Sequence, residues 1–191
     1  MKEVIFATSN PNKVREVNEM LPHLSIKSLK DIGCMEEVPE TTATIHGNAL
    51  QKARYVSEKY KVDCFSEDTG LEVEALNGEP GVDTAHYAGP QRSAEANMAL
   101  LLTNLEGKGN RKARFRTVVA LILNGKEHQF EGVVNGTIAP QKMGDGGFGY
   151  DPIFIPDGYH ISFAEMDKYE KNKISHRGRA IKKLMQFLNS L

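Results

Sequence analysis

Apolar residues in the first part of the chain follow two different periods. Residues 2–8 contain a continuous apolar run of the kind found in a buried strand. Val14, Val17 and Leu21 then recur with the spacing of one helix face. Residues 24–29 alternate between apolar and polar side chains, which predicts a second strand. The order strand, helix, strand predicts a βαβ unit.

The rest of the chain shows the same two periods. Residues 114–123 and 127–134 are strand-like, and Asn124-Gly125 between them is a strong signal for a type I′ turn. This hairpin is antiparallel, so together with the βαβ unit it predicts a mixed sheet. Helical spacing recurs in three further segments: residues 45–60, 94–105 and 162–191.

The stretch Ser66–Val73 places two adjacent carboxylates, Glu67 and Asp68, between the strand-like residues 62–65 and 71–76. We expect a tight turn here, with the acids at the end of a strand. A carboxylate in that position can hold Mg²⁺ or orient a water molecule. Taken alone, the stretch favours the simpler interpretation, in which Asp68 caps its own turn and Glu67 is solvated.

Residues 9–13 join the first predicted strand to the first predicted helix. Ser9 or Asn10 can cap the helix, and Pro11 suits its first position. Free backbone amides there, with Lys13 in the first turn, would form a phosphate-binding site. A well-capped helix with one exposed lysine is an equally good interpretation of the same residues.

The segment 142–152 is rich in glycine and contains G-x-G-x-x-G at Gly144, Gly146 and Gly149. A dinucleotide-binding loop must open a helix, whereas this segment runs into the extended, proline-containing residues 151–156. The glycines instead suit close approach of the backbone to a flat ligand, although a flexible connection would also explain them. Two aromatic residues and an acid accompany them: Phe148, Tyr150 and Asp151.

Two groups of polar residues lie on predicted helices. Lys52 follows Asn48 by four positions, so both project from one side of a helix, where ordinary surface polarity is the simplest explanation. Several hydrogen-bond donors and a possible cap precede or open the last helix: Lys171, Ser175, His176 and Arg177.

Composition narrows the class of protein. A length of 191 residues with 40% hydrophobic residues favours one domain with a substantial core. No apolar run is long enough for a membrane span. Two cysteines give neither a metal-binding spacing nor a disulfide framework, so a reduced cytoplasm is the simplest location. The net charge of −1 does not indicate a general polyanion binder, and the basic runs are mostly expected to be solvated helix faces.

Taken together and in this order along the chain, six stretches resemble the inosine triphosphate pyrophosphatase family, the XTP/dITP diphosphatases or noncanonical purine nucleoside triphosphatases. They are Thr8-Ser9-Asn10-Pro11-Asn12-Lys13, Gly47-Asn48-Ala49 with Lys52, Glu67-Asp68-Thr69-Gly70-Leu71, Pro80-Gly81-Val82, Gly146-Gly147-Phe148-Gly149-Tyr150-Asp151-Pro152 and Ser175-His176-Arg177-Gly178. One such motif would be weak evidence, but all six in sequence are highly specific.

The resemblance implies an α/β fold, an elongated mixed β-sheet with flanking helices and two lobes around a central cleft, spanning residues 1–191 as a single domain. It implies Mg²⁺-dependent hydrolysis of inosine, deoxyinosine and xanthosine triphosphates to the monophosphate and pyrophosphate. It also implies a homodimer. Neither nucleic acid nor a membrane is an expected partner.

The resemblance also assigns roles to particular positions. Asp68 would be the catalytic acid or base and a metal ligand, and Glu40 would help to hold the metal. The residues expected to hold phosphates or sugar are Thr8, Ser9, Asn10, Pro11, Asn12, Lys13, Lys52, Thr69 and Lys171. Those expected to hold the base are Phe148, Gly149, Tyr150, Asp151, His176 and Arg177.

Two positions depart from the family pattern, because His86 and Met143 stand where the family often has arginine. Their presence supports an alternative function, a purine nucleotide-binding sensor that does not cleave its ligand. An RNA-binding protein is a weaker alternative, since basic and aromatic residues do not interleave on a predicted sheet.

Overall fold

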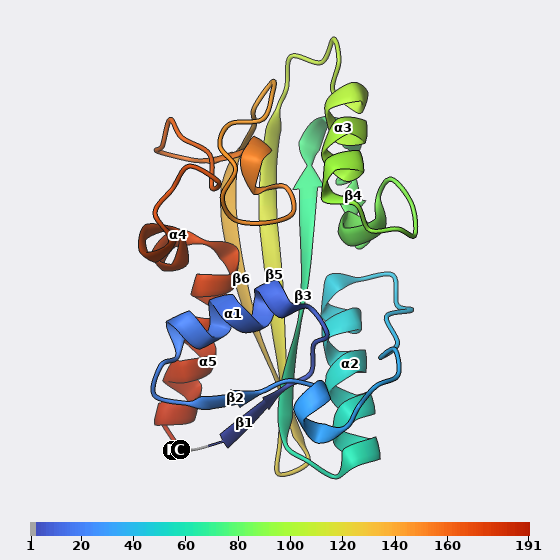
Figure 1. Cartoon of the computed structure of the whole chain (residues 1–191), viewed down its shortest axis with the longest axis vertical. Helices are drawn as coiled ribbons and strands as arrows, with labels where there is room; N and C mark the ends of the chain where they lie inside the picture. Colours follow the sequence, from blue (N-terminus) through green and yellow to red (C-terminus); the bar gives the residue numbers. More distant parts are fainter. Residues whose placement is uncertain (1–2) are drawn as a thin grey trace. The chain divides into compact units, whose positions relative to one another are not determined.

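The computed structural model of the protein describes residues 3–191, and within them seven strands form one sheet (Figure 1). Their order is β2-β1-β3-β5-β6-β7, with β4 paired to β3. β1 is parallel to β2 and β3, whereas β4 is antiparallel to β3 and β7 is antiparallel to β6. The predicted mixed sheet is therefore confirmed. The strands are β1 Glu3–Phe6, β2 Ser25–Lys27, β3 Cys64–Val73, β4 Pro80–Gly81, β5 Lys112–Leu123, β6 Lys126–Ile138 and β7 Phe154–Pro156.

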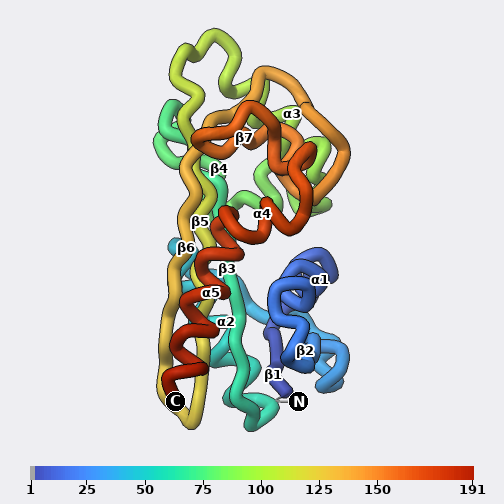
Figure 2. The backbone as a smooth tube through the Cα atoms, turned by 90° about the vertical axis from the view of Figure 1, so that its left-hand side faces the viewer, coloured from blue at the N-terminus to red at the C-terminus, as the bar shows by residue number. Residues whose placement is uncertain are grey.

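The predicted βαβ unit and hairpin are both present. Figure 2 follows the chain from β1 through helix α1, Pro11–Met20, and back to β2, which pairs with β1. The predicted first strand included Lys2, which lies outside the described residues. β5 and β6 are joined by Asn124 and Gly125, whose φ angles of 50° and 73° are those of a type I′ turn.

Three of the other helices follow the predicted periodicity: α2 Ile45–Tyr60, α3 Ala94–Asn104 and α5 His176–Asn189. A further short helix is α4 Lys168–Ile174. Single 3₁₀ turns occur at η1 Lys30–Ile32, η2 Glu74–Leu76, η3 Thr84–His86 and η4 Asp151–Ile153. None of the helices within residues 3–191 combines the length and apolar character needed to cross a bilayer.

The prediction of one helical segment over residues 162–191 is wrong in its first part. Residues 162–167 are not helical, and Ser175 separates α4 from α5 with an extended backbone at φ −66° and ψ 158°. The apolar periodicity that predicted the helix extends over α5 alone, where Ile181 and Leu184 are buried. The polar residues before it carried no such signal.

The prediction of a turn at Ser66–Val73 is also wrong, because β3 runs through this stretch without interruption. One end of β3 pairs with β1 at Phe65, and the other end pairs with β4 at Leu71. The polar residues that favoured a turn are themselves buried, since Glu67 is 0% and Asp68 8% exposed. Lysine side chains, instead of water, compensate the charges of these acids, as described below.

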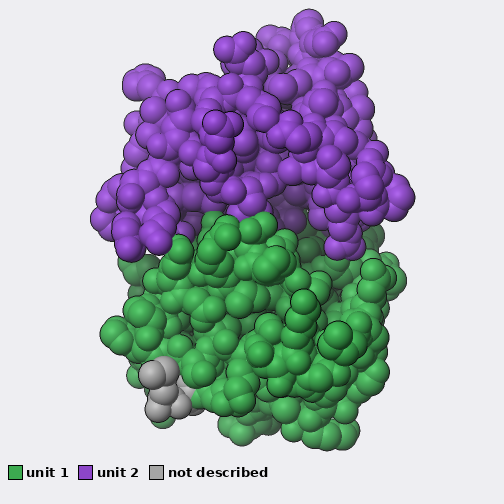
Figure 3. Space-filling model, in the orientation of Figure 1, with its two compact units in different colours: residues 1–68, 117–132, 178–191 green, residues 69–116, 133–177 purple. Residues whose placement is uncertain are grey.

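Two compact units divide the chain (Figure 3). Unit 1 comprises the chain up to Asp68 together with residues 117–132 and 178–191, and unit 2 comprises residues 69–116 and 133–177. The boundaries fall inside β3, β5, β6 and the first turn of α5, so each of these elements contributes residues to both units.

Each unit has its own hydrophobic core. In unit 1 the rings of Phe6 and Phe65 stack with centroids 4.5 Å apart, and α1 and α5 contribute Val17 and Ile181 to the same cluster. In unit 2 the aromatic rings of the core are those of Phe115, Tyr150, Phe154 and Phe163. These cores hold the polar residues described next in fixed positions on their strands and helices.

Candidate functional site

Unit 1 brings together the two predicted metal-binding carboxylates and one predicted substrate-binding lysine. The ammonium group of Lys52 donates a hydrogen bond to Glu40 Oε1 and lies 3.7 Å from Asp68 Oδ1. Lys52 is 7% exposed and Asp68 8%, whereas the Glu40 side chain remains 33% exposed. Residues from the loop before α2, from α2 and from β3 therefore form one cluster around a single cation.

Local contacts explain why the loop before α2 approaches Lys52. Asn48 Oδ1 accepts hydrogen bonds from the backbone N–H and the hydroxyl of Thr42, at 2.9 and 2.8 Å. Gly47 permits this approach, since a Cβ atom there would lie 2.3 Å from the Thr42 hydroxyl. Asn48 and Lys52 are both buried on one side of α2, so ordinary surface polarity does not explain them.

Helix α2 is in turn fixed to β3 on the side that carries Asp68. The hydroxyl of Ser66 donates to the carbonyl of Ala49 on α2. Because side chains two positions apart on a strand share a face, Ser66 and Asp68 both point towards α2. The contact at Ala49 thus places Lys52, three residues further along, beside Asp68.

The carboxyl group of Asp68 is electrostatically unusual. Burial raises its pKa above the ordinary value of 3.8, and the nearby ammonium groups of Lys52 and Lys13 only partly oppose this effect. Its Oδ2 atom is buried and accepts no hydrogen bond from the described residues. A buried carboxylate oxygen of this kind is suited to accept a proton or to bind a cation.

On the other face of β3, Glu67 forms a second ion pair. Its side chain is 0% exposed, and Oε1 lies 3.0 Å from Nζ of Lys13 on α1. Consecutive strand residues point to opposite faces, so Lys13 and Lys52 approach β3 from different sides. The sequence interpretation of Glu67 as solvated is wrong, and the correct strand assignment would have revealed its burial.

The start of α1 does not offer the free amides that the sequence predicted. Asn10 Oδ1 accepts from the backbone N–H groups of Asn12 and Lys13, at 3.0 and 3.4 Å. The N–H of Asn10 donates to the hydroxyl of Thr8 at 3.2 Å. These amides are occupied by local caps, because Asn10 competes for them at the helix N-terminus. Any anion bound here has the Lys13 ammonium and exposed side chains such as Ser9 to contact.

Unit 2 gathers most of the residues predicted to hold the base. Lys171 Nζ donates to Asp151 Oδ2 at 2.7 Å, and the backbone N–H of Phe148 donates to the same oxygen at 2.9 Å. The Lys171 ammonium lies 5.1 Å from the centre of the Phe148 ring. Gly147 is required beside this group, because its φ is +68° and a Cβ there would lie 2.1 Å from Asp151 Oδ2.

His176 and Arg177 complete this cluster. The Arg177 guanidinium lies 5.4 Å from the centre of the Phe148 ring, a cation–π contact. The ring of His176 stacks on Phe115 with centroids 4.5 Å apart. Both residues are nearly fully buried, since His176 is 4% and Arg177 2% exposed. Lys171 and Arg177 thus place two cationic donors over the Phe148 ring, while His176 packs on Phe115.

Tyr150 and Thr69 differ from their neighbours in this region. The Tyr150 ring belongs to the unit 2 core, its hydroxyl donates to the carbonyl of Thr84 at 2.7 Å, and burial raises its pKa. Its side chain thus fixes the glycine-rich loop. Gly149, in the same loop, adopts a φ of +62°, which favours glycine. Thr69 follows Asp68 on β3 and is half-buried.

The two positions that depart from the family pattern make local contacts. Nε2 of His86 lies 3.2 Å from Asp83 Oδ1, and the N–H of Met143 donates to the carbonyl of Pro152 at 2.8 Å. These contacts stabilise turns within unit 2.

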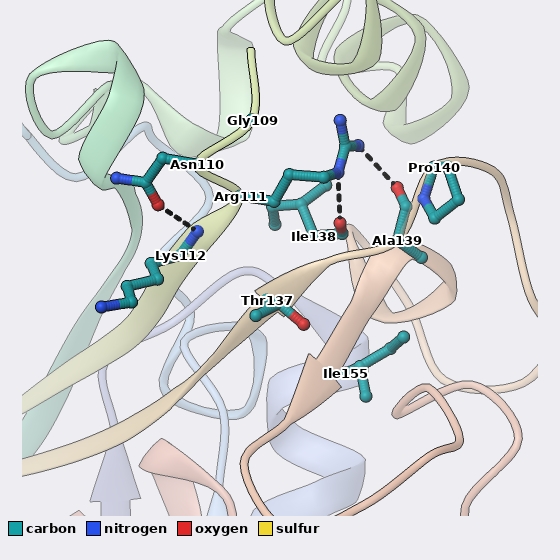
Figure 4. A pocket seen from close by; sticks show the side chains of 9 residues that line it. All are labelled: Gly109, Asn110, Arg111, Lys112, Thr137, Ile138, Ala139, Pro140 and Ile155. Carbon is teal, nitrogen blue, oxygen red and sulfur yellow. Dashed lines mark hydrogen bonds between the residues drawn. The ribbon is translucent and has the colours of Figure 1, made fainter.

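Unit 2 also contains a cavity of about 630 Å³ that is lined by none of the predicted site residues (Figure 4). Its lining comes from residues 109–112 and 137–140 together with Ile155. The Arg111 guanidinium donates to the carbonyls of Ile138 and Ala139, at 2.7 and 2.9 Å. Arg111 thereby joins the start of β5 to the end of β6.

The donor set of unit 1 fits a magnesium ion that binds together with a phosphate ligand. Within residues 3–191, no three His, Cys, Asp or Glu side chains are grouped as a metal site. Mg²⁺, however, is usually held in phosphate-transfer sites by one or two carboxylates, with phosphates and water completing the octahedron. Glu40 and Asp68, which contact the same ammonium group, supply two such carboxylates. Asp68 Oδ2 accepts no hydrogen bond from the described residues, so it can coordinate a cation.

Comparison with known proteins identifies the family. A sequence model described as the Ham1 family matches residues 4–187. A dITP/XTP pyrophosphatase of Flavobacterium psychrophilum is 52% identical over 98% of this chain and 100% of its own, and one of Bacillus subtilis is 44% identical over 100% and 98%.

Solved structures support the fold. A HAM1 protein from Coxiella burnetii has a TM-score of 0.91 with 33% identity, covering 100% of both chains. The Staphylococcus aureus Ham1 protein has a TM-score of 0.90 with 36% identity, covering 99% of both. The predicted α/β class with its mixed sheet and flanking helices is confirmed, as is the family resemblance. The chain belongs to the Ham1 family.

Proposed function

We propose that this protein is a nucleoside triphosphate diphosphatase that hydrolyses noncanonical purine nucleotides, namely ITP, dITP and XTP, to the monophosphate and pyrophosphate with the help of Mg²⁺. The enzyme class follows from the family and from the dITP/XTP pyrophosphatases among its relatives. The structural observation that supports the chemistry best is the cluster of Glu40, Lys52 and Asp68, with its buried carboxylate oxygen.

Hydrolysis at the α-phosphorus requires a base for the attacking water and positive charge near the phosphate oxygens. An ordinary aspartate, with a pKa of about 4, is a weak base at neutral pH. Burial raises the pKa of Asp68 and so makes this carboxylate a stronger base. Lys52 supplies positive charge 3.7 Å from Asp68 Oδ1, and Lys13 adds positive charge from the other side of β3. Mg²⁺, when bound, would compensate phosphate charge and make a bound water more acidic.

We assign recognition of the base to the residues around Phe148 in unit 2. Phe148 offers an aromatic face, and His176 and Arg177 carry hydrogen-bond donors. A donor pairs with the 6-oxo group of hypoxanthine or xanthine but faces another donor at the 6-amino group of adenine. Sites that depend on such a bond can discriminate by several orders of magnitude. Rejection of guanine requires a further interaction at position 2 of the ring.

A panel of ITP, dITP, XTP, ATP and GTP, each supplied with Mg²⁺, tests this function when pyrophosphate and orthophosphate are measured separately. We expect pyrophosphate from the first three and little product from ATP and GTP. Orthophosphate as the main product would contradict the assigned reaction. Tight nucleotide binding without product would favour the sensor. From the family alone we further propose that the protein is cytoplasmic and forms a homodimer. Sedimentation can test the dimer.

A further inference from the structure

Lys52 lies between the two candidate metal ligands, Glu40 and Asp68. Its ammonium group donates to Glu40 Oε1 and lies 3.7 Å from Asp68 Oδ1. We propose that Lys52 is a place-holder cation. Its ammonium group stays between the carboxylates until a divalent metal binds with a triphosphate, and then moves to contact the phosphates. This inference rests on the proposed function for the identity of the metal and the triphosphate.

The carboxylates need a cation even without a ligand. Asp68 is almost completely buried, and a carboxylate removed from water is costly unless an opposite charge compensates it. Lys52 provides one positive charge for two carboxylates, while Lys13 is engaged by Glu67 on the opposite face of β3. The Oδ2 atom of Asp68 still accepts no hydrogen bond from the described residues. Lys52 therefore compensates the pair incompletely, and a dication would compensate it better.

The backbone segments that carry the two carboxylates are held in place. The loop after Glu40 is bound to α2 twice, since Asn48 accepts from Thr42 and the Gln51 side-chain oxygen accepts from the N–H of Thr41 at 2.8 Å. Asp68 belongs to a strand that is paired on both sides. The lysine side chain, by contrast, has a flexible four-carbon stem. When a metal enters, the lysine is the member of this cluster that can move.

Displacement of Lys52 couples the metal to the substrate. In the absence of nucleotide, a metal ion must remove the ammonium from its carboxylates and leave it close to a second positive charge, which weakens metal binding. A triphosphate gives the displaced ammonium phosphate oxygens as new partners. The metal and the triphosphate should then each strengthen the binding of the other, and such coupling is reciprocal.

The test measures binding of Mn²⁺ alone, by electron paramagnetic resonance of the free ion, in the full-length protein. Lys52→Met should bind Mn²⁺ at least about tenfold more tightly than the wild type, because no ammonium competes for the carboxylates. Lys52→Arg should bind it as weakly as the wild type. Lys59→Met is the matched control, since Lys59 lies on the same helix and pairs with Glu36 at 2.7 Å outside this cluster; it should leave Mn²⁺ affinity unchanged. Equal affinity in Lys52→Met and the wild type would overturn the proposal.

A second measurement needs no variant and covers the case in which Lys52→Met does not fold. The side-chain ¹⁵Nζ resonance of Lys52 should shift when saturating Mg²⁺ is added with a non-hydrolysable purine triphosphate analogue. An unchanged resonance would overturn the proposal. Neither measurement requires turnover, so a protein that binds Mn²⁺ as expected but releases no pyrophosphate would contradict the proposed function and leave the place-holder intact.

Discussion

The buried ion pair between Lys171 and Asp151 allows a quantitative prediction about unit 2. The two charged atoms lie 2.7 Å apart, and the side chains are only 6% and 5% exposed. Lys171→Met leaves the Asp151 carboxylate buried without its ammonium partner. Loss of one member of a buried pair lowers the free energy of unfolding by about 3–5 kcal/mol. We expect the lower end of this range, because the N–H of Phe148 still donates to Asp151.

The same magnitude can be expressed as a melting temperature. In a chain of this length, each kcal/mol lowers Tm by about 2–4 °C, so Lys171→Met should lower it by about 6–12 °C if the loss is about 3 kcal/mol. Differential scanning calorimetry measures the change directly. Urea denaturation with an unchanged m-value would confirm that the variant loses stability without a change in the surface exposed on unfolding.

Lys173→Met is the matched control on the same helix. Lys173 pairs with Glu170 at the same distance of 2.7 Å, but its side chain is 68% exposed. An exposed pair contributes about 0–1 kcal/mol, so its loss should shift Tm by at most about 4 °C. The double variant Asp151→Asn, Lys171→Met should recover most of the lost stability, because it removes both charges of this ion pair and retains an acceptor for the N–H of Phe148. Equal Tm changes in Lys171→Met and Lys173→Met would refute the reasoning.

Three further predictions concern the site. Asp68→Asn should lower turnover by about 10²–10⁴-fold and raise Tm at neutral pH. Burial raises the pKa of Asp68 in the folded protein above its usual 3.8. The stability that Asp68 contributes is therefore complete below pH 3.8 and is lost as pH rises through the folded-state pKa. A Tm advantage that persists below pH 3.8 would contradict this cause. Gly147→Ala should weaken nucleotide binding and lower stability more than Gly149→Ala does, and calorimetry measures both effects. Both glycines have a positive φ, but only a Cβ atom at position 147 would collide with Asp151. Removal of divalent metal with EDTA should abolish pyrophosphate release, and Mg²⁺ should restore it; unaffected turnover would argue against a metal-dependent reaction.

Periodicity predicted most of the secondary structure, because packing here depends on regular apolar faces. The faces of α2 and α5 are buried as their spacing indicated, and the Asn124-Gly125 hairpin has the expected turn. The failures occur where polar residues are buried. Ser66–Val73 resembled a turn only because its acids were assumed to need solvent, and the long-range partners Lys13 and Lys52 that remove this need are invisible to local patterns.

The site was predictable in composition but less so in detail. The resemblance assigned Glu40 and Asp68 to the metal, and the structure brings both to the ammonium group of Lys52. It assigned Lys171 to phosphates or sugar and Asp151 to the base, whereas these two residues form an ion pair. The motifs did not reveal that Glu67 engages Lys13, or that Asn10 occupies the amides of α1. Both contacts depend on which rotamer and which strand face a residue adopts, and one-dimensional spacing specifies neither.

The alternation of side chains along β3 makes its alignment with neighbouring strands a chemical requirement as well as a folding requirement. A slip by one residue would exchange the faces of Glu67 and Asp68. Asp68, the proposed general base, would then meet the lysine of α1, and Glu67 would meet the lysine of α2. A single inserted residue between Phe65 and Glu67 could therefore preserve every functional group in this protein and still abolish catalysis.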